Sequence, residues 1–373
     1  MLRFALVGAG GGNSSMPDRL WPSHPNVLRQ QIMSDVAHAA VRGSGYAQAT
    51  DALIHRLAIQ EPLAAEPFLV YGSIALREGD YGRAEQLLRL ATVRAPRSVA
   101  AHYLLSDLYL RSGRIADAVA EMGVLNRLLP GAMVQLAPAL AAYARAPGAF
   151  KRLGPVLDRY PEMKPRLLLA LAADTRQTEL VLALARSGNA DEAGVFWREQ
   201  LVGNLVKEGS HEKAYRVWAK LSNVKQPPGS LFNPTFDASR APAPFNWELA
   251  RGSGGVAEAR NGGLQVLYYG RETMALAAQT LMLMPGSYQF AMTVSGTAPA
   301  PGAISWQMTC LGSGAQILLL PITGKSASKR VHAEIRVPAN GCGAQKLELR
   351  AEEREFPQRA DFHMSRLQLA RSG

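Results

Sequence analysis

One segment decides the N-terminal fold of this chain: AEPFLVYGSIALREGDYGRAEQLLRLATVRAPRS, residues 65–98. Its first half has the apolar spacing of a short amphipathic helix, Gly79 supplies a turn, and a second helical pattern runs to Pro96. Working outward, prolines recur 34 residues apart at 62, 96 and 130, and glycines recur at the same interval at 45, 79 and 113. A period of this length predicts stacked helical hairpins, each too small to bury its apolar face alone.

The recurring spacing has a direct packing reason. Small residues at Gly72 and Ala84 allow the two helices of one hairpin to approach closely, and apolar side chains at Leu88 and Met122 can fill the seams between hairpins. Proline cannot continue a helix interior and therefore ends each unit. These positions indicate an α-helical solenoid.

The same pattern resembles the tetratricopeptide repeat in its small residues, turn glycine, alanine and terminal proline. The match is clearest over 65–98 and 99–132 and looser over 31–64. The resemblance implies a solenoid over 31–225, regular over 31–132 and irregular over 133–225. The short apolar opening of the chain and the glycines that follow it predict a flexible leader at 1–30.

In this repeat architecture the first helix of each unit lines a concave face that holds protein partners. The resemblance implies a partner-binding groove, and the residues expected to line it are Arg42, Arg77, Tyr103, Asp107 and Arg111. Guanidinium groups along a groove could hold an acidic peptide or another anion. The alternative is that these arginines are solvated and paired with neighbouring carboxylates.

A second domain with a different pattern follows a linker at 226–230. Beyond it the apolar residues alternate with a period of two, and Gly, Pro and Asn-Gly turns separate many short strands. The pattern predicts an antiparallel β-sandwich over 231–373.

Two motifs sharpen this expectation. The segment LFNPTFD at 231–237 precedes Phe245-Asn-Trp247, and Q-x-L-x-L-x-P-G-x-Y spans 279–288. Together they resemble the galactose-binding-like class of jelly-roll carbohydrate-binding modules, although Asp237 replaces the usual glutamate and Pro234 the usual glycine. The resemblance implies a sandwich that can contact glycan.

Sugar binding would require exposed aromatic rings beside polar side chains. The candidates for this role are Trp247, Tyr268, Tyr269, Arg271 and Trp306. Each ring could equally belong to the core, and strand alternation places Tyr268 and Tyr269 on opposite faces.

The only cysteines of the chain, Cys310 and Cys342, both lie in this domain. Each ends or follows a strand, so they are a candidate disulfide, with two buried free thiols as the alternative. No histidine or third cysteine accompanies them at ligand spacing, so no metal site is expected.

Composition and motifs exclude several function classes. The net charge is +11, but it is spread along the chain instead of concentrated in one block, which argues against a nucleic-acid binder. No apolar run is long enough for a transmembrane helix, which leaves peripheral membrane association open. No nucleophile elbow, phosphate loop or histidine pair appears, so neither catalysis nor a cofactor is expected.

The sequence therefore predicts a non-enzymatic scaffold that recruits protein partners through its repeats and contacts glycan through its sandwich. Analogy places such a protein in the bacterial periplasm or cell envelope, in exopolysaccharide assembly or export. Two alternatives remain: a glycan-processing enzyme with an appended binding module, and a cytoplasmic repeat adaptor with a purely structural sandwich.

Overall fold

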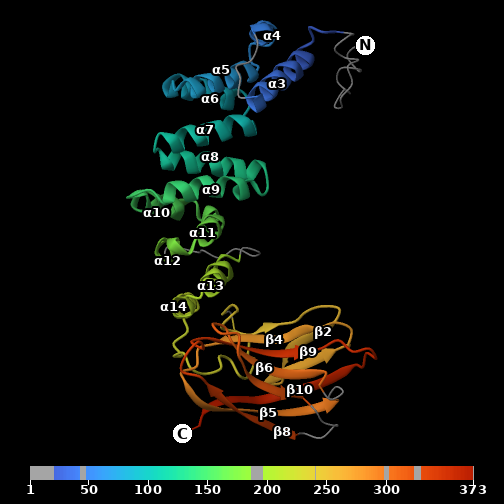
Figure 1. The fold of residues 1–373 in the computed structure, drawn as a ribbon. Coiled ribbons are helices and arrows are strands. Elements are labelled where there is room, and N and C mark those ends of the chain that lie inside the picture. The colour runs from blue at the N-terminus through green and yellow to red at the C-terminus, as the bar shows by residue number, and fades with distance from the viewer. Residues whose placement is uncertain are drawn as a thin grey trace. The chain divides into compact units, whose positions relative to one another are not determined.

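The computed structural model describes most of the chain as helices followed by a β-sandwich (Figure 1). The described residues are 21–42, 48–185, 196–239, 241–297, 302–322 and 329–372. They divide into two compact units. The first reaches Ala170 and takes in Leu182–Ala185; the second comprises Leu171–Val181 and the described residues from Phe196 onward.

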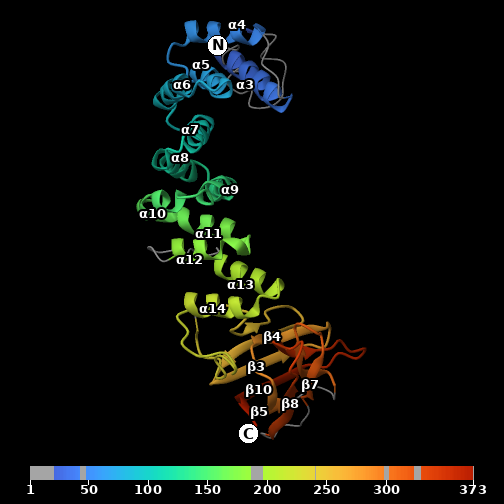
Figure 2. The same cartoon turned by 60° about the vertical axis from the view of Figure 1, so that its left-hand side comes forward.

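The first unit is a series of helices that pack as successive antiparallel pairs (Figures 1 and 2). Their bounds are α3 Pro25–Arg42, α4 Gln48–Gln60, α5 Glu66–Glu78, α6 Tyr81–Arg94, α7 Val99–Arg111, α8 Ile115–Leu128, α9 Ala132–Ala144 and α10 Ala149–Arg159. A 3₁₀ turn, Pro161–Met163, leads into α11 (Lys164–Ala172), and a second, Thr175–Gln177, leads into α12 (Thr178–Ala185). Because α3 begins at Pro25 and buries Val27 and Leu28, the predicted flexible leader at 1–30 is wrong for residues 25–30.

The hairpin of α5 and α6 shows how the sequence pattern produces the fold. Gly79 ends α5 with φ at 82°, a left-handed conformation that glycine adopts without strain. Asp80 then caps α6, since its Oδ1 accepts a hydrogen bond from the backbone N–H of Arg83 at 3.0 Å. Ala84 and Leu88 are fully buried on the face of α6 that meets α5.

The helices of this hairpin are in close contact at Gly72. A Cβ added there would lie 2.8 Å from Cγ of Leu88, so a larger side chain must displace the packed helix. We expect Gly72→Val to lower the free energy of unfolding by about 1–3 kcal/mol through overpacking. Urea denaturation should measure this loss. Gly82→Ala, at an exposed position of α6, is the control, and it should be neutral or stabilising by up to about 1 kcal/mol. Equal losses in the two variants would contradict the close-approach explanation.

The next hairpin, α7 and α8, is joined by a buried histidine as well as by apolar contacts. His102 is 7% exposed. Its Nδ1 lies 2.5 Å from Oε2 of Glu121 on α8, and its Nε2 lies 3.0 Å from the carbonyl oxygen of Pro96. The ring thus ties α7 both to its partner helix and to the turn that precedes it.

Tyr109 on α7 gives this region a pH-dependent stability. Burial raises the pKa of Tyr109 from 10.0 to about 12, and the second cause of this increase is the hydrogen bond that its hydroxyl donates to Glu85. The folded state holds this proton more tightly than the unfolded state. The resulting contribution of Tyr109 to the free energy of unfolding is therefore complete below pH 10 and is lost as pH rises from about 10 to about 12. We expect Tyr109→Phe to show a smaller loss of stability over that interval in urea denaturation. An unchanged alkaline slope would contradict the assignment.

The repeat register changes after Pro130. Tyr103 on α7 is 53% exposed, whereas Ala137, which stands 34 residues later on α9, is 3% exposed. The exposed apolar residue of α9 is instead Val134, at 61%. The helical arrangement therefore continues beyond the regular repeats with a different face turned outward.

Beyond residues 171–181, the described part of the second unit contains two helices, α13 (Trp197–Lys207) and α14 (His211–Leu221), and an antiparallel sandwich of two five-stranded sheets. One sheet has the order β1-β4-β9-β6-β7 and the other β2-β3-β10-β5-β8. The strand bounds are β1 Glu248–Leu249, β2 Gly255–Arg260, β3 Gly263–Tyr268, β4 Met274–Leu281, β5 Gly286–Thr297, β6 Ile304–Cys310, β7 Gln316–Pro321, β8 Lys329–Val337, β9 Gln345–Ala351 and β10 Ala360–Arg371. Consecutive strands from β3 to β6 alternate between the sheets, which confirms the predicted jelly roll.

Strand alternation builds the core of the sandwich. On β9, Leu347 and Leu349 are fully buried between the sheets, whereas Glu348 and Arg350 point outward. Trp306 of β6 lies at the centre, with its ring 5.5 Å from that of Phe290. The described part of the chain includes no helix that is long and apolar enough to cross a membrane.

Two buried glutamines on β4 and β9, inner strands of one sheet, bond the backbone of segments that lie beyond the strands. The side-chain amide of Gln279 accepts from the backbone N–H of Phe232 at 3.1 Å and donates to its carbonyl at 2.8 Å. The amide of Gln345 makes the equivalent pair of bonds with Leu283, at 2.8 and 3.4 Å. The glutamine of the Q-x-L-x-L motif is thus a structural residue that replaces a missing strand partner.

Candidate functional site

Four of the five predicted groove residues lie on exposed parts of α5 and α7. We call Arg77, Tyr103, Asp107 and Arg111 the repeat face. Tyr103, Asp107 and Arg111 follow one another at four-residue intervals, so they share one side of α7. Arg42 is the last residue of α3, and its side chain falls outside the described residues.

An ion pair organises the repeat face. Nε of Arg111 donates to Oδ2 of Asp107 at 2.8 Å, and this bond raises the pKa of the arginine. The Arg111 side chain nevertheless remains 59% exposed. Its two outer nitrogens can therefore bind a further carboxylate while Asp107 fixes the side chain in place.

Three of the five sugar-binding candidates are core residues, so their predicted role is wrong. Trp247, Tyr268 and Trp306 are 9%, 1% and 0% exposed. Strand alternation turns Tyr268 and Trp306 toward the opposite sheet, and the Tyr268 hydroxyl lies within hydrogen-bond distance of two acceptors, the carbonyls of Glu272 at 2.8 Å and Glu352 at 3.0 Å. A ring enclosed in this way cannot stack on a pyranose.

Trp247 is enclosed by other aromatic residues. Its ring stacks on Phe236 at a centroid separation of 4.8 Å and meets Trp306 edge-on at 5.9 Å. Its indole N–H donates to the carbonyl of Asn233 at 2.9 Å. The 231–247 segment thus seals one side of the sandwich core.

The remaining two candidates, Tyr269 and Arg271, reach the surface just after β3. Tyr269 is half-buried and Arg271 is exposed. The adjoining loop, anchored where the backbone N–H of Arg354 donates to the carbonyl of Gly270 at 3.3 Å, carries Phe356 with 78% exposure. We call Tyr269, Arg271 and Phe356 the sandwich rim. Sequence reasoning missed Phe356 because it ends an acidic run that is typical of a solvated loop.

A shallow polar hollow also lies on the outer face of one sheet. It has a volume of about 350 Å³ and is lined in part by Glu258 and Arg260 of β2, Gln265 of β3 and Asp361 of β10. The amide of Gln265 donates to Oδ1 of Asp361 at 2.7 Å. We call this feature the sheet hollow; its carboxylates, amide and guanidinium can exchange hydrogen bonds with hydroxyl groups.

Cys310 and Cys342, the candidate disulfide pair, are bonded in the structure. Both residues are buried, at 0% and 3% exposure. The bond joins the end of β6 to the loop before β9. Among the described residues, no group of three or more histidine, cysteine, aspartate or glutamate side chains could hold a metal ion.

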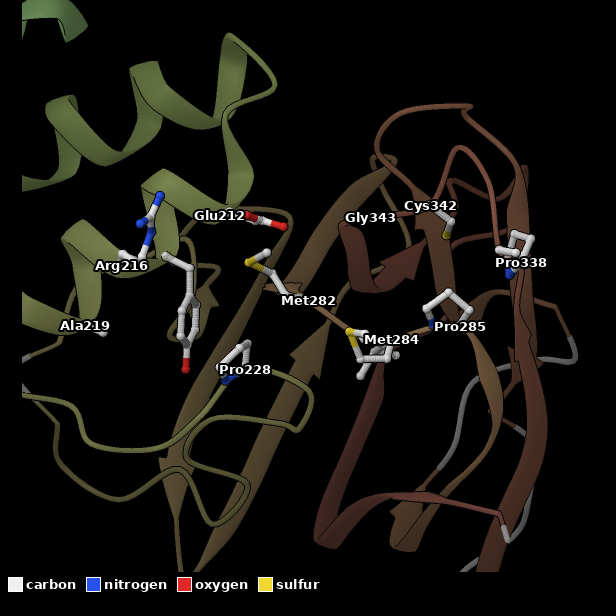
Figure 3. Close-up of a pocket in the computed structure, with 13 residues that line it drawn as sticks. Glu212, Arg216, Ala219, Pro228, Met282, Met284, Pro285, Pro338, Cys342 and Gly343 are labelled. Atoms are coloured by element: carbon white, nitrogen blue, oxygen red, sulfur yellow. The ribbon is translucent and has the colours of Figure 1, made fainter.

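A larger cavity within the second unit lies between α14 and the end of the sandwich (Figure 3). It has a volume of about 660 Å³. We call it the α14 groove. Its main lining residues are Glu212, Tyr215, Arg216 and Ala219 of α14, Pro228, Met282, Met284 and Pro285 near the β4–β5 turn, and Pro338, Cys342 and Gly343 before β9. No motif in the sequence indicates it, because its walls come from segments far apart along the chain.

Aromatic packing holds α14 against the sandwich beside this groove. Trp218 is fully buried, and its indole N–H donates to the carbonyl of Pro242 at 2.7 Å. Its ring centroid lies 5.0 Å from that of Phe232 and 5.5 Å from that of Phe245. One wall of the groove is therefore fixed by the fold of the second unit.

Comparison with known proteins identifies the helical repeats. Residues 75–142 match the family model described as tetratricopeptide repeat. A comparison with curated proteins finds no match. The chain is also similar to several solved structures at low sequence identity and low TM-score.

These structures correspond to different parts of the chain. A structure described as CBM4 is 13% identical, with a TM-score of 0.32, and the alignment covers 38% of this chain and 100% of that one. The C-terminal family 22 carbohydrate-binding module of Clostridium thermocellum Xyn10B is 20% identical, with a TM-score of 0.25 and coverages of 40% and 98%. YrrB, described as a tetratricopeptide-repeat protein with an unusual peptide-binding site, is 13% identical, with a TM-score of 0.26 and coverages of 46% and 92%. The chain thus joins tetratricopeptide repeats, matched over residues 75–142, to a C-terminal jelly-roll sandwich.

Proposed function

We propose that the protein is a non-enzymatic adaptor whose repeat face binds an acidic segment of a partner protein. The observation that carries this proposal is the position of Arg77 and Arg111, one repeat apart on the exposed ends of α5 and α7. Repeat arrays of this kind offer extended surfaces for binding other chains. The exposed ring of Tyr103 adds an apolar contact beside the two guanidinium groups.

The strength of such binding should depend on charge. Each exposed ion pair contributes about 0.2–1 kcal/mol, so losing both arginines should weaken binding by about tenfold and reduce its dependence on salt. The test is affinity purification of the full chain from its native host with quantitative mass spectrometry. The double variant Arg77→Gln, Arg111→Gln should recover clearly less of its partner than the wild type. Arg83→Gln, an exposed change on α6, is the control and should retain it.

Equal recovery of every partner by the wild type and the double variant would contradict a role for the repeat face. Circular dichroism of the double variant should match that of the wild type, because both arginines are exposed.

A second function, glycan binding by the sandwich, is favoured by the sheet hollow and the sandwich rim. The hollow offers carboxylates and an amide for sugar hydroxyls, and Phe356 offers an exposed ring for stacking. A glycan array probed with the full chain tests this role. If the array signals persist after Asp361→Ala and after Phe356→Ala, the glycan does not bind at the sheet hollow or at the sandwich rim. An array without signals would leave the sandwich a purely structural module.

The location that fits both functions is the bacterial periplasm or cell envelope, with exopolysaccharide assembly or export as the process. The buried Cys310–Cys342 bond supports an oxidising compartment. Non-reducing mass spectrometry of protein from the native host tests this point. Free thiols there would favour the cytoplasmic alternative.

A further inference from the structure

The α14 groove has the size and lining of a small-molecule site. At about 660 Å³ it lies within the range of roughly 300–1,000 Å³ that is usual for such pockets. Glu212, Tyr215, Arg216 and Ala219 occupy one stripe of α14, at the three- and four-residue spacing of a single helix face. The adjacent face of the helix is held in place by the buried Trp218, whose ring lies 5.5 Å from that of Tyr215, so this wall exists before any ligand arrives.

The wall opposite the helix is apolar and adaptable. Met282 and Met284 approach from the β4–β5 turn, and Met284 is 65% exposed. Unbranched thioethers adjust to ligands of different shape. The Tyr215 ring is fixed on the helix side, because its hydroxyl donates to the carbonyl of Gln226 at 2.8 Å.

Charges at the helix wall give the groove a preference among amphipathic ligands. Glu212 and Arg216 are one turn apart, in the order that favours an ion pair, yet they form none, and their charged groups have no partner among the residues that the structure describes. Figure 3 shows Glu212 directed toward Met282 and Arg216 extending away from it. Lys213 adds a second positive charge beside the groove, with its Nζ donating to the carbonyl of Thr175 at 3.4 Å. The neighbouring His211 carries little positive charge at neutral pH, because burial lowers its pKa.

We propose that the α14 groove binds an amphipathic organic acid. The apolar body of the ligand lies against Tyr215, Met282 and Met284, and its carboxylate binds the guanidinium of Arg216, which no group of the described chain neutralises. Glu212 limits the affinity by repulsion and so sets a preference for a single negative charge. This ligand site is separate from the repeat face and does not depend on the adaptor function.

Isothermal titration calorimetry with the full chain tests the proposal, using decanoate, decan-1-ol and decylammonium as probes below their aggregation concentrations. Decanoate should bind with 1:1 stoichiometry and more tightly than the other two. Arg216→Gln should weaken decanoate binding by about five- to tenfold, which corresponds to the net contribution of one typical hydrogen bond, and should leave decan-1-ol unchanged. Glu212→Gln should strengthen decanoate binding and weaken decylammonium binding.

Two further variants locate the site. Ala219→Trp should fill the groove and reduce binding of all three probes by more than about tenfold. Met284→Ser, at an exposed position where folding is not at risk, should weaken all three by a smaller factor. Phe356→Ser on the sandwich rim is the control for non-specific binding and should change nothing. The proposal is overturned if no probe binds, if decanoate binds the Ala219→Trp and Met284→Ser variants as tightly as the wild type, or if decylammonium is the preferred probe.

Discussion

Replacing Trp218 with alanine is expected to lower the free energy of unfolding of the second unit by about 3–5 kcal/mol. The indole is fully buried, contacts Phe232 and Phe245, and donates a hydrogen bond to Pro242. Its removal would leave a cavity between α14 and the sandwich, and would also leave the Pro242 carbonyl without its donor.

Chemical denaturation followed by circular dichroism measures this loss. Phe196→Ala is a matched control, because that ring is 63% exposed and its truncation should change stability by less than about 0.5 kcal/mol. The Trp218 variant should also lose decanoate binding, since the helix wall of the α14 groove would no longer be fixed. A loss of less than about 1 kcal/mol would show that α14 does not depend on Trp218 for its position.

Removal of the disulfide should have the second large effect. Cys310 and Cys342 are separated by 32 residues along the chain, and loop-closure entropy for this separation predicts a stabilisation of about 3–4 kcal/mol. We expect the double variant Cys310→Ala, Cys342→Ala to unfold at a correspondingly lower denaturant concentration. Reductant should lower the midpoint of the wild type toward that of the variant and leave the variant unchanged. Equal midpoints for oxidised wild type and variant would contradict a stabilising role for the bond.

The architecture could be predicted from the sequence because each part has a strong local pattern. Gly72, Ala84 and Leu88 fix the distance between two helices, and this packing requirement produces a recognisable residue pattern in each repeat. The sandwich is equally visible, since Leu347 and Leu349 alternate with Glu348 and Arg350 on a strand. In both cases the packing requirement acts on residues that are close together in the chain.

The site residues were harder to predict because exposure depends on contacts between distant segments. Alternation places Tyr268 and Tyr269 on opposite faces, but only the second sheet decides that Tyr268 is the buried one. Trp247 has an aromatic ring of the type that stacks on sugars, yet Phe236 and Trp306 enclose it. For the same reason the α14 groove has no sequence signature.

The repeat face was predicted in part. The sequence shows Asp107 and Arg111 four residues apart, and the structure confirms that they form an ion pair. This pair agrees with the alternative hypothesis that the arginines are solvated and paired with neighbouring carboxylates. Arg111 keeps most of its side chain exposed despite this pair. A structural ion pair and a surface for partners are thus compatible at this position.

The central claim, that partners bind at the repeat face, can be tested most directly by site-specific photo-crosslinking in the native host. A photoreactive amino acid at Tyr103, which is 53% exposed on α7, should give a discrete adduct with one partner protein. The same group at Val93, which is 76% exposed on α6, is the control and should give no such adduct. Adding Arg77→Gln and Arg111→Gln should reduce the Tyr103 adduct by about tenfold, because both charge contacts are lost. No adduct at Tyr103, or the same adduct from both positions, would contradict the account.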